Sequence, residues 1–411
     1  MKPLEHRLRV LMVNKYYSPP HLGGVEMVVR TLSEGLVEHT GARVRALVSN
    51  ESRERSEETI GGVEVIRLPR QLRLSSAPVA LGMRGALRRE SRHLAPDGRP
   101  EPPDIVNLHS PYPWGELSFL LSRVYLPSVL LYHSDIVRQK RLLAAYRPFL
   151  ERILDRVDLI VTSSQNMVDN SQFLAPRAAK CRVVPYGLPA ERLDSTPAIE
   201  RRALELRAAH GGNPIVLFVG RLVYYKGLEI LVRAMKGADA DLVLIGEGPL
   251  EDDLRTLAAQ SGMAGRATFL APQDDEELLA WYRAADVFCL PSVARSEAFG
   301  LVQIEAHAAG TPVVSTDLPT SVPYANLHEV TGLTVRSGDV QALREALVRL
   351  LSDAELRARL GRQAQARALR EFTVPRMVAG MLEVYAEARE RHAVRASART
   401  GVKQTARAGR A

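Results

Sequence analysis

Residues 215–235 read IVLFVGRLVYYKGLEILVRAM and specify the fold of the chain around them. The run from Ile215 to Val219 is apolar and rich in β-branched residues, which predicts a buried strand. Gly220 ends this run, and from Gly227 to Met235 the apolar residues recur at helical spacing. A buried strand, a loop and a helix form the repeating unit of parallel α/β sheets, so we expect an α/β fold.

The same unit recurs on both sides of this stretch. Before it, strands are predicted at 8–13, 43–48, 63–68, 104–108, 128–132, 158–162 and 182–185, and helices at 24–38, 116–125, 137–155 and 165–173. After it, strands are predicted at 241–245, 267–270, 286–290 and 312–315, and helices at 250–260, 275–283, 301–309 and 340–351. The two series predict two Rossmann-like domains, with ligands in the cleft between them beyond the carboxyl ends of the strands.

A linker separates the two series. Residues 185–214 contain Gly187 followed closely by Pro189, a charged helix around 199–209, and Gly211 next to Gly212. We therefore expect a first domain over residues 1–190 and a second over 191–373, each long enough to bury its own core.

Composition excludes several classes of protein. The 411 residues are 46% hydrophobic and 25% charged, which excludes a disordered or fibrous chain. Cys181 and Cys289 are too few for a disulfide framework and lie in apolar surroundings, as in a protein of the reducing cytoplasm. A charge and a proline interrupt the longest apolar stretch, 117–131, and residues 1–7 lack the apolar region of a signal peptide. We expect neither a membrane-spanning helix nor export by that route.

The positive charge of the chain is concentrated at one end. The formal net charge is +8, and residues 389–411 hold seven Lys and Arg against one Glu, which accounts for six of these charges. With a nearly neutral body and only 5% aromatic residues, nucleic-acid binding is not expected. The segment 391–411 has no apolar stripe, so we expect a disordered, solvated tail, with weak attraction to an anionic membrane as the alternative.

Three loops carry residues suited to an anionic ligand. Gly23 and Gly24 stand between a predicted strand and helix, where a backbone can approach a ligand closely, although paired glycines are also common in turns. Arg221 and Lys226 follow the strand quoted above and lie before a helix, a placement that suits a diphosphate, although both could be solvated loop cations.

The third loop follows the strand predicted at 286–290. Phe299, Gly300 and Leu301 open an apolar helix whose first amides can bind phosphate. Glu297 precedes this helix, and Glu305 lies within it among apolar residues. A carboxylate accepts paired hydrogen bonds from vicinal hydroxyls, so one can bind a sugar and the other a ribose.

Together these motifs resemble the retaining glycosyltransferases of family 4, which have the GT-B fold. The resemblance covers Leu8 to about Ala388. It rests on the Glu-x7-Glu spacing of Glu297 and Glu305, on Gly220-Arg221 with Lys226-Gly227, on Gly246-Glu247-Gly248-Pro249-Leu250, and on Gly23-Gly24-Val25-Glu26. A GT-B fold implies that the helix at 374–390 packs back on the first domain.

The resemblance implies a role for each donor-site residue. Gly23 and Gly24 would lie against the donor. Arg221 and Lys226 would hold the donor diphosphate and offset the charge of the leaving nucleoside diphosphate, in place of a metal ion. Glu297 would bind hydroxyls of the transferred sugar, the amides of Phe299, Gly300 and Leu301 its phosphates, and Glu305 the ribose. Ala271 stands at the position where the family contacts the nucleotide base through backbone atoms and where glycine is more common. This position therefore does not predict which base the donor carries.

The resemblance also identifies a histidine. His133 ends a predicted strand and matches the active-site histidine that contacts the donor sugar in the family. His109 ends another strand, and we place it on the acceptor side together with Asp135. The catalytic set is thus His133, Arg221, Lys226 and Glu297, with no carboxylate nucleophile and no obvious general base, because the family is described as reacting on one face of the sugar.

The surroundings of His133 resemble bacterial mannosyltransferases of surface-polysaccharide assembly that use GDP-mannose. We therefore expect hexose transfer from GDP-mannose to a lipid-linked or saccharide acceptor, without a resident cofactor or metal. We expect a cytoplasmic protein, with peripheral contact between its tail and the inner face of the membrane as the alternative. UDP-glucose, UDP-galactose and UDP-N-acetylglucosamine are the alternative donors. A sugar-nucleotide epimerase or dinucleotide-dependent oxidoreductase is disfavoured because no Gly-x-Gly-x-x-Gly follows the first strand.

Overall fold

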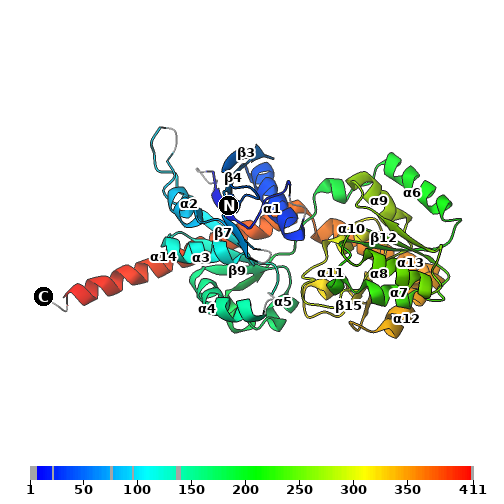
Figure 1. Cartoon of the computed structure of the whole chain (residues 1–411). Coiled ribbons are helices and arrows are strands. Elements are labelled where there is room, and N and C mark those ends of the chain that lie inside the picture. The colour runs from blue at the N-terminus through cyan, green and yellow to red at the C-terminus, as the bar shows by residue number, and fades with distance from the viewer. Residues whose placement is uncertain (1–6, 21–22, 75–76, 95–96, 136–139, 409–411) are drawn as a thin grey trace. The chain divides into compact units, whose positions relative to one another are not determined.

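A computed structural model describes residues 7–20, 23–74, 77–94, 97–135 and 140–408 (Figure 1). The chain divides into two compact units. Unit 1 comprises Met1–Ser163, Ser171–Pro185 and Val374–Ala411, and unit 2 comprises Ser164–Asn170 and Tyr186–Thr373. Relative to the expected division at residue 190, the change of unit falls at Pro185, and a short segment around α5 (Gln165–Asn170) belongs to unit 2.

Unit 1 is built on an eight-stranded sheet in the order β10-β9-β8-β7-β1-β2-β4-β3, parallel except for β3. Its strands are β1 (Arg9–Val13), β2 (Arg43–Ser49), β3 (Ser56–Ile60), β4 (Val63–Leu68), β7 (Ile105–Ser110), β8 (Ser128–Tyr132), β9 (Leu159–Thr162) and β10 (Cys181–Val183). A separate hairpin pairs β5 (Leu72–Leu74) with β6 (Ala77–Val79). The central strands are buried along their whole length, as in sheets covered by helices on both faces.

The helices of unit 1 are α1 (Gly24–Thr40), α2 (Met83–Glu90), α3 (Pro113–Ser122), α4 (Lys140–Arg156) and α14 (Val374–Ala408), with the 3-10 helix η1 (Ala175–Lys180). The start predicted for α4 at residue 137 lies outside the described residues. Helix α14 packs against α1, where Gly35 leaves room for Val374: a Cβ at Gly35 would lie 2.4 Å from its Cγ1.

Unit 2 is built on a six-stranded parallel sheet in the order β13-β12-β11-β14-β15-β16. Its strands are β11 (Ile215–Val219), β12 (Asp241–Ile245), β13 (Ala267–Leu270), β14 (Val287–Leu290), β15 (Val313–Thr316) and β16 (Gly332–Val335). In sequence terms this is the order 3-2-1-4-5-6 of a dinucleotide-binding Rossmann domain, whose ligand site lies where the order reverses, between β11 and β14. The α/β prediction is confirmed for both units.

The helices of unit 2 surround this sheet. They are α5, α6 (Pro197–Ala209), α7 (Leu228–Ala234), α8 (Glu251–Gln260), α9 (Asp275–Ala284), α10 (Leu301–Ala308), α11 (Val322–Ala325), α12 (Val340–Ser352) and α13 (Ala354–Glu371), with the 3-10 turns η2 (Ala190–Arg192) and η3 (Tyr224–Lys226). The core is formed by the buried strands together with the apolar faces of α7, α9 and α12, for example Leu231, Tyr282 and Leu347.

The C-terminal segment differs from the disordered tail expected over 391–411. Helix α14 continues to Ala408, because this segment is rich in Ala and Arg, which favour helices, and holds no proline. Two of its side chains bind the buried carboxylate of Asp158: Arg395 at 3.1 Å and His392 at 3.2 Å. The segment up to residue 398 therefore belongs to unit 1, and residues 409–411 lie outside the described part of the chain.

Candidate active site

The loops that follow β11, β12 and β14 press tightly together at the carboxyl edge of the second sheet. Gly227 adopts φ +68°, and a Cβ there would lie 2.1 Å from the carbonyl oxygen of Pro291. A Cβ at Gly246, with φ +141°, would lie 2.1 Å from the carbonyl oxygen of Gly220. Only glycine allows these approaches, so the three loops form one surface at the point where the strand order reverses.

An ion pair occupies this surface. Lys226 Nζ lies 2.6 Å from Glu297 Oε2, and the two side chains are only 10% and 9% exposed. The Ser292 hydroxyl donates a hydrogen bond of 2.9 Å to the same carboxylate oxygen. Two predicted site residues that are 71 positions apart in the sequence are therefore in direct contact. A buried cation beside a carboxylate can bind a phosphate oxygen and a sugar hydroxyl next to each other.

Arg221 lies in the same loop as Lys226 but differs in its surroundings. Its side chain is exposed, and Nη2 donates a hydrogen bond of 3.2 Å to the Tyr225 hydroxyl. The Tyr225 ring also lies 5.7 Å from Lys226 Nζ. The loop therefore combines one buried, paired cation with one exposed cation that can reach a ligand from solvent.

The first turn of α10 adjoins Glu297. Gly300 adopts φ +73° before Leu301, the first helical residue, and no described side chain caps this end of the helix. A Cβ at Gly300 would lie 2.6 Å from Leu290 Cδ2, so glycine is required there for packing as well as for conformation. Phe299 is buried against Tyr186 and Phe372, with ring centroids 5.1 and 6.0 Å away. These contacts hold the start of the helix in place, with amides suited to an anion.

Glu305 is more constrained than its sequence suggests. It is 3% exposed and accepts hydrogen bonds of 2.7 Å from Arg192 Nη1 and of 2.7 Å from the Tyr282 hydroxyl. Arg192 also binds Asp275 on α9. Sequence reasoning missed Arg192 and Tyr282, because a single Arg in a linker and a Tyr in a helix carry no local signal. Since an ionised carboxylate has about four lone-pair sites, Glu305 can still accept ribose hydroxyls.

Ala271 follows β13 at the edge of the same sheet. It is exposed, and its carbonyl oxygen accepts a hydrogen bond of 2.7 Å from the Gln273 side-chain amide. Unit 2 thus carries Arg221, Lys226, Ala271, Glu297, Phe299, Gly300, Leu301 and Glu305, while unit 1 carries Gly23, Gly24, His109, His133 and Asp135.

In unit 1 the two predicted histidines are in contact. His109 Nδ1 lies 2.9 Å from His133 Nε2, and the rings are stacked with centroids 5.2 Å apart. Asn107, which sequence reasoning did not single out, donates from Nδ2 to His109 Nε2 over 2.9 Å. Burial lowers the pKa of His133 to about 3 and places that of His109 well below its usual value, so both rings are neutral.

The other predicted residues of unit 1 surround the same edge of its sheet. Asp135 accepts hydrogen bonds of 2.7 Å from the Tyr132 hydroxyl and 2.8 Å from the Ser171 hydroxyl. Gly23 precedes α1 in an extended conformation, where a Cβ would lie 2.3 Å from Glu26 Oε2, and at Gly24 a Cβ would meet no atom of the described residues within 4 Å. Neither glycine therefore covers the backbone at the start of α1 with a side chain of its own.

Glu116 is a titratable residue that sequence reasoning did not single out. It lies in the first turns of α3 and is 1% exposed; Oε1 accepts a hydrogen bond of 2.8 Å from the Tyr112 amide, and Oε2 binds the Tyr146 hydroxyl. Burial raises the pKa of Glu116 to about 7. Its bond to the chain just before α3 indicates a helix-capping role.

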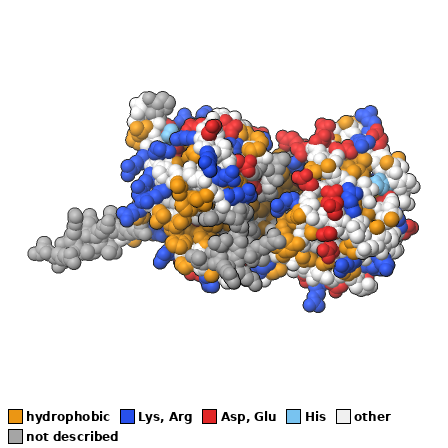
Figure 2. All heavy atoms as spheres, viewed as in Figure 1, with side chains coloured by type: hydrophobic (Ala, Val, Ile, Leu, Met, Phe, Trp, Pro, Cys, Tyr) orange, Lys and Arg blue, Asp and Glu red, His pale blue; other side chains and the backbone are white. Residues whose placement is uncertain are grey.

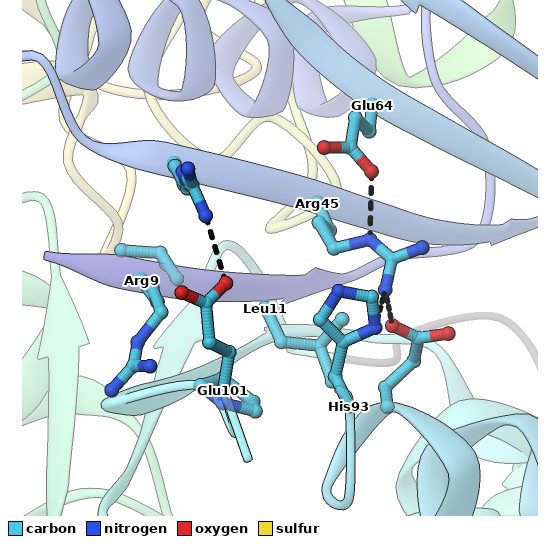
Figure 3. Close-up of a pocket in the computed structure, with 10 residues that line it drawn as sticks. Arg9, Leu11, Arg45, Glu64, His93 and Glu101 are labelled. Atoms are coloured by element: carbon cyan, nitrogen blue, oxygen red, sulfur yellow. Dashed lines mark hydrogen bonds and ion pairs between the residues drawn. The ribbon is translucent and has the colours of Figure 1, made fainter. Parts of the chain in front are cut away.

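A further charged cluster lies near the amino ends of β1 and β2, away from the predicted residues (Figure 3). Arg45 binds Glu64 at 3.0 Å, the His93 ring at 2.8 Å and also Glu90. Ligands of parallel sheets bind at the opposite, carboxyl edge, so we assign this cluster to the fixing of α2 and the loop after it. Within the described ranges, no group of His, Cys, Asp and Glu suits a metal ion, and none of the helices has the combination of length and hydropathy that a membrane span needs.

Comparison with known proteins agrees with this geometry. Residues 204–367 match the family model described as glycosyl transferases group 1, and residues 23–187 match a glycosyl transferase 4-like domain. The chain is 35% identical over 366 residues to D-rhamnosyltransferase WbpZ of Pseudomonas aeruginosa, covering 89% of this chain and 92% of that one. It is 33% identical over 378 residues to O-antigen chain mannosyltransferase C of Escherichia coli, covering 92% and 98%.

Solved structures agree on the fold. Sucrose-phosphate synthase of Thermosynechococcus elongatus is similar with a TM-score of 0.75 and 25% identity, over 93% of this chain and 99% of the other. HepE of Anabaena, solved with UDP-glucose, is similar in fold with a TM-score of 0.72 and 19% identity, over 92% and 100%. The architecture is that of GT-B glycosyltransferases, and the chain belongs to glycosyltransferase family 4, whose group 1 domain forms its second unit.

Proposed function

We propose that this glycosyltransferase transfers a hexose from a nucleoside diphosphate sugar, with GDP-mannose as the first candidate, to a lipid-linked or saccharide acceptor of a bacterial surface polysaccharide. The observation that carries the proposal is the buried contact between Lys226 and Glu297, which lies next to the first turn of α10. The names of the two relatives, a D-rhamnosyltransferase and an O-antigen chain mannosyltransferase, support a surface-polysaccharide product.

In this proposal each donor-site group has one task. Lys226 and the exposed Arg221 bind the diphosphate and offset the charge that develops on the leaving nucleoside diphosphate, so no metal ion is needed for that purpose. The amides at the start of α10 bind the phosphate adjoining the sugar. Glu297 accepts hydrogen bonds from hydroxyls of the transferred hexose, Glu305 from the ribose, and the backbone at Ala271 meets the base. His133 contacts the sugar from unit 1, with Gly23 and Gly24 beside the donor.

The transfer itself proceeds with retention of the anomeric configuration. The bond between the anomeric carbon and the phosphate oxygen breaks, and the acceptor hydroxyl forms its bond on the same face of the sugar. The leaving phosphate oxygen takes the acceptor's proton, so neither a carboxylate nucleophile nor a separate general base is assigned.

Ligand-induced stabilisation of the purified protein tests the donor. A ligand that binds only the folded state at about 100 times its Kd stabilises that state by about 2.7 kcal/mol, which raises the melting temperature measurably. We expect GDP and GDP-mannose to do so without added metal, followed by mannosyl transfer. Selective binding of UDP or UDP-glucose would mean that the donor is a UDP-sugar and not GDP-mannose. The absence of nucleotide binding would contradict the donor site.

We also propose that the protein acts in the cytoplasm, where unit 1 contacts an anionic membrane surface. Leu121 and Tyr125, near the end of α3, are 50% and 63% exposed, and Arg123 and Arg152 are exposed nearby. Residues 399–411 add four Lys and Arg and no acidic residue. Figure 2 shows hydrophobic side chains bordered by Lys and Arg on unit 1. Apolar side chains ringed by cations suit the interface of a bilayer that holds acidic lipids.

Vesicle sedimentation tests this contact. The protein should sediment with phosphatidylglycerol vesicles and remain in the supernatant with phosphatidylcholine vesicles. Deletion of residues 399–411 combined with Tyr125→Ser should abolish sedimentation, while transfer to a soluble acceptor persists. Equal sedimentation of this variant and the intact chain would contradict the assigned surface.

A further inference from the structure

Three polar side chains form a continuous chain of hydrogen bonds inside the sheet of unit 1. Asn107 and His109 are two residues apart in β7, so their side chains lie on the same face of the sheet. His133 directly follows the neighbouring strand β8. Asn107 Nδ2 lies 2.9 Å from His109 Nε2, and His109 Nδ1 lies 2.9 Å from His133 Nε2. Their exposures are 0%, 1% and 2%, so all three are withdrawn from water.

Such a chain is unusual at this place. Central strands of parallel sheets are nearly continuous apolar runs, and burying polar groups costs free energy unless they are hydrogen-bonded. Asn107 is incompletely satisfied, since its Oδ1 has no hydrogen-bond partner among the described residues. Apolar side chains would fill positions 107 and 109 with less loss of hydration, so the polar pair calls for an explanation other than stability.

The amide of Asn107 determines which atom donates and which accepts in each of these hydrogen bonds. Its amide nitrogen can only donate, and it also points at Met12 Sδ, 3.3 Å away on β1, a weak acceptor that fits this amide orientation. His109 Nε2 therefore accepts. A neutral imidazole carries one proton, so His109 has it on Nδ1 and donates to His133 Nε2. His133 in turn carries its proton on Nδ1.

We infer that Asn107 and His109 are positioning residues that hold His133 as the Nδ1–H tautomer, so that His133 acts in glycosyl transfer as a hydrogen-bond donor and not as a proton acceptor. The inference rests on the proposed contact of His133 with the donor sugar and defines its chemistry. With Nε2 occupied by His109, an oxygen that His133 meets through Nδ1 receives a hydrogen bond and cannot lose a proton to it. This assignment agrees with a reaction in which the leaving phosphate, not a histidine, takes the proton.

The first test is the tautomeric state in the intact protein. Long-range 15N–1H NMR on the full chain labelled with 15N-histidine distinguishes protonated from unprotonated ring nitrogens, with His109→Asn and His133→Asn used for assignment. We expect both rings to be neutral, with Nδ1 protonated and Nε2 unprotonated, between pH 6 and pH 8. A proton on Nε2 of His133 would overturn the inference. This measurement uses the ligand-free wild-type protein and is independent of whether the donor is GDP-mannose.

The second test reverses the direction of the hydrogen bonds between residues 107, 109 and 133. Asn107→Asp replaces a donor by an acceptor of nearly equal size, so a neutral His109 must donate from Nε2 and accept at Nδ1, which requires the proton of His133 to be on Nε2. We expect the 15N signals of His133 to show Nε2 protonated and Nδ1 unprotonated. We also expect kcat to fall by about a hundredfold, the usual loss when one hydrogen-bond donor to a transition state is removed. Met12→Leu is the matched control, because it removes the sulfur acceptor and leaves the direction unchanged, so kcat should stay within about twofold.

The two tests separate the inference from the proposed function. Reversed tautomers with an unchanged kcat would overturn the positioning role, even if the protein proves to be a mannosyltransferase. If wild-type protein transfers no sugar from any nucleotide donor, the proposed function fails, while the tautomers are still read from the spectrum. If Asn107→Asp does not fold, the wild-type spectrum alone decides the direction of the chain.

Discussion

The contact between Lys226 and Glu297 is the central feature at the scale of single residues. Both side chains are buried, so removing one partner leaves the other as an uncompensated charge, which costs about 3–5 kcal/mol for buried pairs. Substitutions that delete a side chain therefore mix loss of stability with loss of function. Near-isosteric substitutions separate the two effects better.

Glu297→Gln is the sharpest residue-scale test of the site. The amide keeps the shape of the side chain but weakens the binding of sugar hydroxyls and the pairing with Lys226, so we expect kcat/KM to fall at least about a hundredfold. Initial-rate kinetics with the donor identified by binding measures this loss. Glu229→Gln is the matched control, since Glu229 is 55% exposed and its Oε2 lies 3.7 Å from Arg233 Nη2, which is also exposed. Near-normal transfer by Glu297→Gln would contradict the assignment of Glu297 to the donor site.

Arg192 is expected to act through Glu305. Among the described residues, Arg192→Ala leaves the Tyr282 hydroxyl as the one remaining hydrogen-bond partner of this buried carboxylate, which is then free to change rotamer. We expect the calorimetric Kd for the nucleoside diphosphate to rise about tenfold, equivalent to about 1.4 kcal/mol. Arg202→Ala serves as the control, because Arg202 is 46% exposed and its ion pairs among the described residues, with Glu205 and Glu277, do not involve Glu305. Unchanged affinity in Arg192→Ala would mean that Glu305 is held without it or does not contact the ribose.

At the scale of elements, α14 shows how local sequence can be misread. The segment after residue 390 has the charge and composition of a solvated tail, but it continues the helix and reaches the buried carboxylate of Asp158. Asp158 Oδ2 also accepts a hydrogen bond of 2.9 Å from the Ser128 amide, which ties β8 to the start of β9. The helix thus supplies one cation, Arg395, and one imidazole, His392, to a carboxylate buried in unit 1.

Two truncations test the role of this helix. Ending the chain at Glu390 removes His392 and Arg395 and leaves Asp158 without either partner, so we expect the melting temperature to fall by about 4 °C or more. Ending it at Ala398 keeps these contacts and should leave the melting temperature within about 1 °C. Differential scanning calorimetry measures both. Equal melting temperatures for the two truncated chains would assign residues 391–398 to a solvated extension after all.

At the scale of the whole molecule, buried titratable groups determine how stability depends on pH. His109, His133 and His307 are buried, and burial lowers the pKa of each below its usual value, to about 3 for His133 and His307. Below pH 6.5 the unfolded chain binds protons that these folded imidazoles do not. Their contribution to stability is therefore lost as the pH falls from 6.5, by about 1.4 kcal/mol per pH unit for each ring.

Burial of Glu116 changes the stability with pH in the opposite direction to burial of the histidines. Its pKa rises from 4.5 to about 7 on burial, so between these values the folded state binds the extra proton and stability falls as the pH rises. Since three histidines oppose one carboxyl group below pH 6.5, we expect the melting temperature to increase from pH 5 to pH 6.5. Calorimetric scans across this range check the expectation. Glu116→Gln should raise the melting temperature relative to wild type more at pH 8 than at pH 5, and the reverse order would contradict a raised pKa.

The sequence by itself predicted most of the two sheets, because a buried parallel strand is a short apolar run that needs no knowledge of its neighbours. It missed β3, a polar edge strand with four of its five residues exposed, since such a strand is held by backbone hydrogen bonds to β4 and has no apolar pattern. It also missed α2, α13 and β16. The motif residues around Glu297 were likewise visible locally, because glycines and charged residues after a strand are a local signal.

Only the tertiary structure decided which of these residues meet. Lys226 contacts Glu297 because β14 pairs with β11 rather than with its sequence neighbour β13, and His109 reaches His133 because β7 pairs with β8. Arg192 reaches Glu305 and Arg395 reaches Asp158 across 113 and 237 positions. The physical reason is that hydrophobic periodicity acts over a few residues, whereas these contacts depend on strand order and helix packing, which bring distant parts of the chain together.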